Sequence, residues 1–288
     1  MRLSLLVPEL IWPEPADQLA LGKLSAPGFE WLAARAKLTR QPRQAFELAL
    51  ARHFALDEAP LGALRRLGEA DEALRQKARE GHWLCADPVH LRFHQERIIL
   101  ADAGAFDLEE GEATTLIGAL NVEFADIGEF HLGTARRWYL RLHDAGREKL
   151  VNAAVNRSFE PISAVAGRLV DSEHSDKKAP LTRWLNEVQM FLHGHPTNER
   201  RQSEGKPAIN SLWLWGVGNL PGASSNHAFT LSSDNPIAIG LSSANHVPRR
   251  PLPADLAGLL SDAAPDSEQL VVLDSLLPPV LYEDSEGW

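Results

Sequence analysis

The chain has 288 residues, of which 44% are hydrophobic, and a formal net charge of −10 at neutral pH. This length fits one large domain or two medium ones. The acidic balance disfavours nucleic acid and anionic membrane surfaces as partners. The single cysteine, Cys85, excludes an internal disulfide framework and a thiolate metal cluster.

The N-terminal sequence, MRLSLLVPELIWPEP, contains a short apolar run that Pro8 and Glu9 interrupt. No small-residue cleavage site follows it, so we interpret residues 2–7 as a buried first strand rather than a signal peptide. No apolar stretch reaches the roughly 20 residues that a membrane helix needs. These features lead us to expect a cytoplasmic protein.

The rest of the first quarter predicts helices. Residues 27–37 place apolar side chains on one face. Residues 43–56 and 60–79 are rich in Ala, Leu, Arg and Glu, which favour helices.

Residues 81–145 predict a compact unit of strands and a helix. WLCADPVHLR, RIILAD and RRWYLRLHD are strand-like, and in the last of these Trp138, Leu140 and Leu142 alternate with polar or aromatic neighbours. A helix over 107–121 is predicted between them, with Asp107 as N-cap and Glu110 completing a capping box.

The second half mixes helix and strand signals. Residues 171–180 predict a loop, and residues 180–193 predict an amphipathic helix that begins at a proline. NSLWLWGVGNLPG predicts a core strand, and the apolar runs PIAIGLS and LVVLDSL predict further parallel core strands. A short helix is expected over 253–261.

Strands at both ends of the chain, with a distinct unit between them, indicate an inserted domain. We predict a core formed by residues 1–78 and 205–288 and an inserted α+β domain over residues 79–204.

Three segments carry polar residues suited to binding or catalysis. The first, WLCADPVHLRFH, contains Asp87, His90 and His94, which could ligate zinc or serve as acid and base. On one strand, however, the two histidines would be about 13 Å apart, too far to share an ion without a bend. The alternatives are a ligand contact by Asp87 or His90 and an ordinary strand with outward polar residues.

The second segment is HGHPTNERR, which follows the predicted amphipathic helix and contains His193, His195, Asn198, Arg200 and Arg201. Guanidinium groups offer paired donors to phosphate or carboxylate, which favours an anion site. The His-x-His spacing also occurs in metal sites. A polar loop that ends a helix is the alternative, since cations stabilise helix C-termini.

The third segment is NSLWLWGVGNLPG, in which Gly216 and Gly218 follow a strand. Such glycines permit close approach of a ligand to the backbone at a sheet edge. The dinucleotide fingerprint is incomplete, and Trp213 and Trp215 are most simply core residues.

Four segments, taken in order along the chain, resemble the archaeal-type cofactor-independent phosphoglycerate mutases of the alkaline phosphatase superfamily. They are ADPVHL, ILADAGAFDLEEGEATTLIGALN, RRWYLRLHD and HPTNERRQSEGKPAINSLWLWGVGNLPG. SAPGFEWLAARA and FALDEAPLGAL resemble two further segments of that family. Bacterial proteins described as RpfE-type regulatory proteins or phosphoglycerate mutase-like are similar as well. The resemblance implies an α/β fold with an alkaline-phosphatase-like three-layer core sheet and an inserted α+β domain.

The resemblance also implies which residues would bind a ligand. His195, Asn198 and Arg201 match a His-Pro-x-Asn-x-x-Arg element of the family. The remaining candidates by alignment or proximity are Asp87, His90, Arg200, Asn210, Gly216 and Gly218.

The sequence departs from the family at the catalytic parts. The opening Asp-Gly motif is missing, and only Glu9 or Glu14 could substitute for its metal-binding Asp. The region of the family's nucleophilic serine reads RQAFELALARHFALD, without a serine. The late Asp-His-Ser-Thr and His-x-Asp-Pro metal motifs are missing, and the relatives are expected to continue beyond the last residues, YEDSEGW.

Phosphoryl transfer needs an activated nucleophile and cations that neutralise the developing charge. We therefore expect a degenerate mutase-like protein that acts as a regulator or binds a small phosphorylated or anionic metabolite, with no resident cofactor. The alternatives are an active phosphoglycerate mutase or phosphatase with an altered site, which would use Mn or Mg, and a scaffold without ligand.

Overall fold

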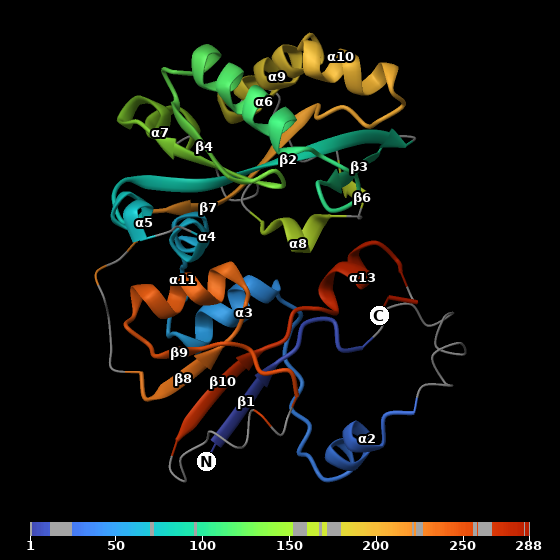
Figure 1. Cartoon of the computed structure of the whole chain (residues 1–288), viewed down its shortest axis with the longest axis vertical. Coiled ribbons are helices and arrows are strands. Elements are labelled where there is room, and N and C mark those ends of the chain that lie inside the picture. Colours follow the sequence, from blue (N-terminus) through green and yellow to red (C-terminus); the bar gives the residue numbers. More distant parts are fainter. Residues whose placement is uncertain are drawn as a thin grey trace.

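The computed structural model describes residues 2–11, 25–69, 72–94, 97–151, 160–166, 169–171, 180–220, 222, 227–255, 258, 267–284 and 286–287. Its strands form two sheets that follow one another along the long axis of the molecule (Figure 1). The sheet at the top of Figure 1 is antiparallel and the one at the bottom is parallel, so the fold is α/β with two distinct kinds of sheet.

The antiparallel sheet is built around one long strand. Its strands are β2 (His82–His94), β3 (Arg97–Asp102), β4 (Gly128–Thr134), β5 (Arg137–Leu142), β6 (Leu169–Asp171) and β7 (Ser211–Gly218). Along one edge β2 pairs first with β5 and then with β3, and along its other edge it pairs with β7. The predicted strands of this region are confirmed, and β4, which the sequence did not single out, completes the hairpin with β5.

Helices cover the upper face of this sheet in Figure 1. They are α6 (Glu110–Glu123), α7 (Asp144–Leu150), α9 (Pro180–His193) and α10 (Pro196–Ser203). The alternation predicted for β5 is confirmed, because Trp138, Leu140 and Leu142 are buried beneath the helices while Tyr139 is buried on the opposite face.

The start of α6 differs from the sequence prediction. The N-cap is Glu109, not Asp107, and Glu112, not Glu110, completes the capping box by accepting from the Glu109 backbone at 3.1 Å. Glu112 faces the protein interior, where it also pairs with Arg201, so a tertiary contact selects this register of the cap.

The parallel sheet has the order β1-β10-β8-β9. Its strands are β1 (Arg2–Leu6), β8 (Phe229–Ser232), β9 (Arg249–Arg250) and β10 (Glu268–Val272). The two strands predicted at the ends of the chain pair directly with each other, Arg2 opposite Glu268 through Leu6 opposite Val272. Helices α3 (Phe46–His53) and α11 (Pro236–Ala244) pack on the face that is turned toward the antiparallel sheet (Figure 1).

The prediction of a strand in PIAIGLS is wrong, since these residues form α11. The side chain of Asn235 caps the helix by accepting from the backbone N–H groups of Ile237 at 2.9 Å and Ala238 at 3.2 Å. Pro236 occupies the first turn, where its missing N–H does no harm. The run is apolar on all sides because α11 is buried between α4 and the parallel sheet.

Helix α4 (Leu61–Glu69) lies between the two sheets and contacts α11, β2 and β7. The close approach of α4 to β2 and to α11 depends on glycines. A Cβ on Gly62 would lie 2.6 Å from the Leu84 Cα, and one on Gly240 would lie 1.8 Å from the Leu64 carbonyl oxygen. Helices α4 and α5 (Glu72–Ala78) both lie within residues 60–79, the stretch predicted to be helical.

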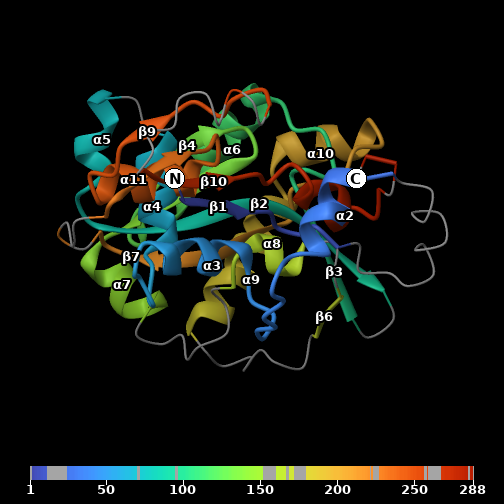
Figure 2. The same cartoon turned by 90° about the horizontal axis from the view of Figure 1, so that it is seen from below.

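Three short helices complete the described chain: α2 (Pro27–Ala33), α8 (Ile162–Val165) and α13 (Leu277–Leu281). Helix α2 ends earlier than the predicted 27–37, buries none of its residues and stands to one side of the parallel sheet in both views (Figures 1 and 2). The predicted loop over 171–180 and helix over 253–261 lie mostly outside the described residues.

The pairing of β7 with β2 puts residues 211–218 into the antiparallel sheet, although they follow the predicted boundary at residue 205. The division into a core of 1–78 and 205–288 and an insert of 79–204 stays a prediction. Among the described helices, none is both long enough and apolar enough to cross a membrane.

Candidate functional site

Asp87 lies on β2 and faces α4, where it forms a buried ion pair with Arg65. The Arg65 guanidinium donates to both carboxylate oxygens of Asp87, at 2.6 and 2.8 Å, and both residues are at most 5% exposed. The indole N–H of Trp215 donates to the same carboxylate at 2.7 Å, and the backbone N–H of Trp138 does so at 3.3 Å. The carboxylate is thus held on several sides by protein donors, as a structural anchor would be.

Arg65 has further partners in the same place. Its Nε donates to the Tyr139 hydroxyl at 3.0 Å, and the guanidinium stands over the rings of Tyr139 and Trp215 at 4.8 and 5.0 Å. Tyr139 in turn donates to Glu69. The sequence analysis missed Arg65, although an arginine among the leucines of a helical apolar stripe signals a buried partner.

His90 and Asn210 extend the pairing between β2 and the segment before β7. The Asn210 side chain accepts from the Leu91 N–H at 2.7 Å and donates to the Leu91 carbonyl at 2.9 Å, as a paired strand residue would. His90 Nδ1 donates to the carbonyl of Ala208 at 2.8 Å. Both side chains fix the approach of residues 208–210 to β2.

Asn198 is fully buried in α10 and bonds only to backbone. Its amide nitrogen donates to the carbonyls of Leu192 and Ile209, each at 2.8 Å, and its oxygen accepts from the Ile209 N–H at 2.8 Å. Both amide hydrogens are therefore used, which leaves no donor for a ligand.

Arg201 is also fully buried, and each of its three nitrogens donates within the protein. The partners are Glu112 at 2.6 Å and the carbonyls of Asp107 and Pro207 at 2.7 and 2.8 Å. The neighbouring Arg200 is 59% exposed and lies 3.9 Å from the other oxygen of Glu112. This geometry ties α10 to the start of α6.

His195 is the N-cap of α10. Its Nδ1 accepts from the Thr197 N–H at 3.2 Å, and burial lowers the pKa of the imidazole below its ordinary value. A neutral imidazole suits this role because the cap needs an acceptor.

Gly216 and Gly218 lie where β7 passes the start of α4. Gly216 has a φ of +67°, and a Cβ there would lie 2.7 Å from the Gly62 nitrogen. A Cβ on Gly218 would lie 2.6 Å from Pro60. These glycines admit a neighbouring segment of the same chain.

The predicted ligand-binding residues thus divide into separate groups. Asp87 faces α4, while Arg201 lies beyond the opposite face of the sheet, against the start of α6. The geometry favours structural roles for them, and their assignment to a ligand site stays a prediction.

The carboxyl edge of the parallel sheet holds a second polar cluster, which the sequence analysis also missed. Asn235 follows β8 and donates to Asp274, which follows β10, at 2.7 Å. Glu47 lies in the first turn of α3, and Ser163 of α8 donates to it at 2.7 Å. Open α/β sheets bind ligands at this edge.

Glu47 is only 5% exposed, and burial raises the pKa of its carboxyl above the ordinary value. Ser163 lowers that pKa by donating to the charged form, and the negative charge of Asp274 raises it further. Buried carboxyl groups with a raised pKa are candidates for acid–base roles.

The edge residues do not fit a two-metal centre. Among the residues that the structure describes, no three His, Cys, Asp or Glu side chains gather closely enough to hold an ion. Glu9 is within 3.3 Å of Arg43, and Glu14 lies outside the described residues.

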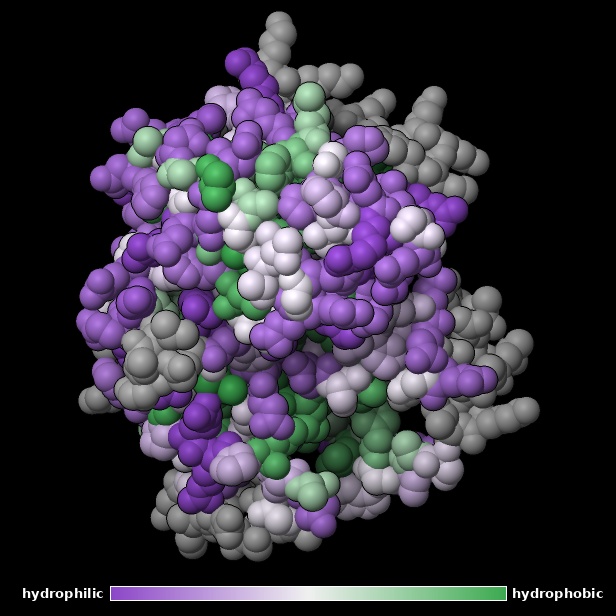
Figure 3. Space-filling model, turned by 45° about the horizontal axis from the view of Figure 1, so that its top comes forward, coloured by the Kyte–Doolittle hydropathy of each residue, from purple (hydrophilic) through white to green (hydrophobic). Residues whose placement is uncertain are grey.

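Figure 3 shows the side above the antiparallel sheet as largely hydrophilic, with hydrophobic side chains along the middle of the upper half and in the recessed lower half. Val122 of α6 and Met190 of α9 are large hydrophobic side chains that the helices above this sheet expose.

Comparison with known proteins agrees with this fold. No family model matches the chain. It is 28% identical over 176 residues to a probable 2,3-bisphosphoglycerate-independent phosphoglycerate mutase of Geobacter sulfurreducens, covering 60% of this chain and 39% of that protein. It is 30% identical over 129 residues to 2,3-bisphosphoglycerate-independent phosphoglycerate mutase 2 of Methanothermobacter thermautotrophicus, covering 44% and 30%.

Two solved structures are similar. The PH0037 protein from Pyrococcus horikoshii superposes with a TM-score of 0.51 at 15% identity, covering 99% of this chain and 75% of that one. A cofactor-independent phosphoglycerate mutase from Thermoplasma acidophilum gives 0.39 at 18% identity, covering 100% and 82%. The chain spans less than half the length of the curated relatives that it matches. The chain is thus similar to phosphoglycerate mutases over part of its sequence, and its α/β fold is similar to that of the PH0037 protein.

Proposed function

We propose that this chain binds a small phosphorylated or anionic metabolite and does not interconvert phosphoglycerates, so that it serves as a regulatory or binding protein. The observation that carries the proposed loss of mutase activity is the set of partners of Asn198 and Arg201. These residues match the mutase element His-Pro-x-Asn-x-x-Arg, yet their donors are bonded to Glu112 and to backbone carbonyls of the same chain.

The region that matches the family's nucleophile supports the same proposal. Residues 43–57 form α3 and its flanks, and they contain no serine. The polar group at the start of α3 is the Glu47 carboxyl, which is buried against Ser163. A buried carboxyl that is bonded to a hydroxyl lacks the exposure that in-line attack on a phosphate requires.

The test is a mutase assay on the purified chain with 3-phosphoglycerate and Mn²⁺. An active cofactor-independent phosphoglycerate mutase under the same conditions is the positive control. We expect no formation of 2-phosphoglycerate above the enzyme-free rate. Robust turnover would contradict the proposal that the chain does not interconvert phosphoglycerates.

One observation favours a second candidate, a phosphatase with an altered site. At the carboxyl edge, Asp274 lies close enough to Glu47 for its negative charge to raise the pKa of the Glu47 carboxyl. Two carboxyl groups in different environments can divide acid and base roles. Release of inorganic phosphate from p-nitrophenyl phosphate, abolished by E47Q, would support this candidate over the binding protein.

A further inference from the structure

Residues 25–44, which we call the α2 arm, are exposed throughout although they include large apolar side chains. The arm contains α2, which buries none of its residues and stands to one side of the parallel sheet (Figures 1 and 2). Phe29, Trp31 and Leu32 are 51%, 57% and 56% exposed. Apolar side chains that gather on a surface mark a site of interaction.

The exposed apolar side chains are concentrated in the N-terminal part of the chain. Those within residues 5–48 are Leu5, Leu10, Ile11, Phe29, Trp31, Leu32, Leu38 and Leu48. Elsewhere in the described part of the chain, Val122 and Met190 are the large hydrophobic side chains that are exposed. The arm supplies half of the first group, so its apolar exposure is not the scattered kind that any surface shows.

The arm is also basic, although the whole chain has a net charge of −10. It contains Arg35, Lys37, Arg40 and Arg43 against one acidic residue, Glu30. Arg43 pairs with Glu9 at 3.3 Å, and the Arg35 guanidinium lies 4.2 Å over the Trp31 ring. Within the described residues Lys37 and Arg40 have no ion pair or hydrogen bond through their side chains, so their charge is available to a partner.

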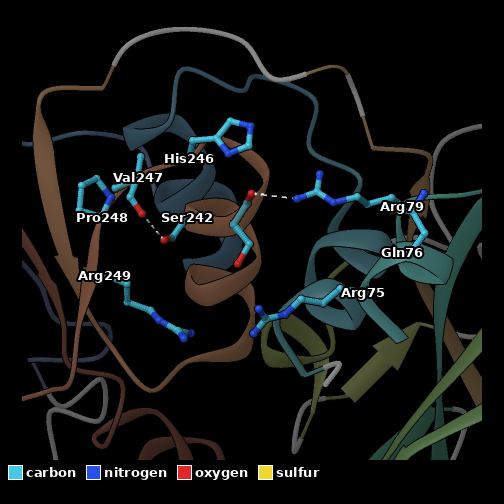
Figure 4. A pocket seen from close by; sticks show the side chains of 9 residues that line it. Arg75, Gln76, Arg79, Ser242, His246, Val247, Pro248 and Arg249 are labelled. Atoms are coloured by element: carbon cyan, nitrogen blue, oxygen red, sulfur yellow. Dashed lines mark hydrogen bonds between the residues drawn. The ribbon is translucent and has the colours of Figure 1, made fainter. Parts of the chain in front are cut away.

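Basic residues elsewhere show what a cation with a partner in the chain looks like. In the pocket between α5 and the end of α11, Arg79 donates to the Ser243 carbonyl at 3.1 Å (Figure 4). Such a cation completes a helix C-terminus of its own protein. The fold gives Lys37 and Arg40 no comparable acceptor among the described residues.

The acidity of the whole chain does not cancel the charge of the arm. Interactions between exposed charges are screened over about 8 Å at physiological ionic strength. A surface that meets the arm therefore responds mainly to the basic residues of the arm. The expectation from net charge, that anionic membrane surfaces are disfavoured, thus need not hold at this place.

We propose that the α2 arm docks on an anionic lipid surface. Phe29 and Leu32 lie three positions apart on one face of α2 and would enter the boundary between headgroups and acyl chains. Trp31 and Arg35 suit the headgroup level, where indole rings and guanidinium groups are favoured. Lys37 and Arg40 supply the attraction to acidic headgroups.

The test is co-sedimentation of the full chain with vesicles of phosphatidylcholine that contain phosphatidylserine, and with vesicles of phosphatidylcholine alone. We expect saturable binding to the first kind, and binding to the second kind that is weaker by about tenfold or more. K37Q/R40Q should weaken binding to the first kind by about tenfold or more, because each basic residue near the surface contributes a factor of about five. R92Q/R183Q is the matched control, since Arg92 and Arg183 are exposed outside the arm and their loss changes the net charge equally.

Fluorescence tests whether the arm itself enters the lipid surface. W31F keeps an aromatic ring, so we expect it to bind while the blue shift that vesicles cause in the tryptophan emission becomes smaller. W31A should weaken binding by about fivefold or more. M190A is its control, because Met190 is an exposed apolar side chain of α9 and its loss should leave binding unchanged.

Three results would overturn the inference. Equal weakening by the two double variants would assign binding to net charge, and no binding to either kind of vesicle would remove a lipid surface as the partner. Self-association of the chain without vesicles, abolished by K37Q/R40Q, would show that the arm meets a second copy of the chain. The mutase assay uses no lipid, so each of these results leaves the proposed function standing.

Discussion

Asp87 and Arg65 form an ion pair in a place that water does not reach, between β2 and α4. Removing two charges from water is costly, and the pair is tolerated because the carboxylate also accepts from Trp215 and the Trp138 backbone. The contribution of this ion pair to stability therefore depends on both partners being present.

The substitution D87N tests that dependence. It leaves the Arg65 charge buried without a counter-charge, so we expect a loss of about 3–5 kcal/mol in the free energy of unfolding. Urea denaturation followed by tryptophan fluorescence measures it. The exposed pair of Glu204 and Lys206 gives the control, E204Q, which should leave the midpoint nearly unchanged. A D87N variant as stable as the wild type would show that Arg65 finds another partner.

The buried carboxyl of Glu47 should make the stability of the folded protein depend on pH, with the opposite sign to that of a salt-bridged carboxylate. Because burial raises its pKa in the folded protein, the folded state holds a proton that the unfolded state has lost in the range above the ordinary value of 4.5. Its contribution to stability is thus present below that value and is lost as the pH rises through the folded pKa.

The variant E47Q should remove this dependence. We expect stability at pH 8 equal to or above that of the wild type, and a flatter decline of stability between pH 5 and pH 8, measured by thermal unfolding. Glutamine keeps an oxygen that can accept from Ser163. The control is E30Q on the exposed face of α2, which should reproduce the wild-type slope. A steep slope that persists in E47Q would assign it to other groups.

Helix α4 is enclosed because glycines let two elements, β2 and α11, approach it closely. Gly62 meets β2, Gly68 meets the start of α11, and Gly240 of α11 meets the backbone of Leu64. Contacts of this kind bring helix axes close together and leave no room for a methyl group.

The substitution G240A should therefore destabilise the protein by about 1–3 kcal/mol or more, since the new Cβ would sit 1.8 Å from the Leu64 carbonyl oxygen and the helices must separate. The control is G118A in α6, where nothing lies within 4 Å of the new Cβ. There the helix gains about 0.5–1 kcal/mol, because alanine loses less backbone entropy than glycine. Equal effects of both changes on the unfolding midpoint would contradict the close crossing.

The elements of this fold were partly predictable from sequence. Alternation in RRWYLRLHD predicted a strand with Trp138, Leu140 and Leu142 on one face, and the structure buries these three side chains together. The run PIAIGLS was misassigned because an apolar stretch of seven residues has the same appearance in a buried strand and a buried helix. The discriminating signal was present in Asn235 and Pro236, a cap followed by a first-turn proline.

The candidate site was harder to predict. The segment HPTNERR supplies donors of the kind that anion sites use, and residue type alone does not say which acceptors they meet. In the folded chain Asn198 meets the backbone of residues 192 and 209, and Arg201 meets Glu112, 89 positions away. The contact between Asn235 and Asp274 was not predicted for the same reason, because it joins residues 39 positions apart in sequence.

At the scale of the whole molecule, two sheets of different type share one apolar cluster. Trp83, Tyr139 and Trp215 reach it from the antiparallel sheet, and Leu231 and Leu270 reach it from the parallel sheet. Helix α4 fills the space between them with leucines from the same cluster. Residues from the expected core and from the expected insert therefore pack in one cluster, and the division of the chain into these two parts stays a prediction.

This shared cluster leads to the prediction that the chain unfolds in a single cooperative transition. Chains of this length often unfold domain by domain, in which case calorimetry resolves more than one peak. Here Leu64 is fully buried between the two sheets, so L64A creates a cavity within the cluster that they share. It should lower the free energy of unfolding by about 2–5 kcal/mol. The whole calorimetric peak should move, and amide protection should fall in both sheets together. L38A, at a side chain that is 77% exposed, is the control and should leave the peak in place. If L64A instead splits the peak, or the strands beneath α6 and α9 keep their protection while β8 and β10 lose theirs, the two sheets unfold independently and the cluster does not couple them.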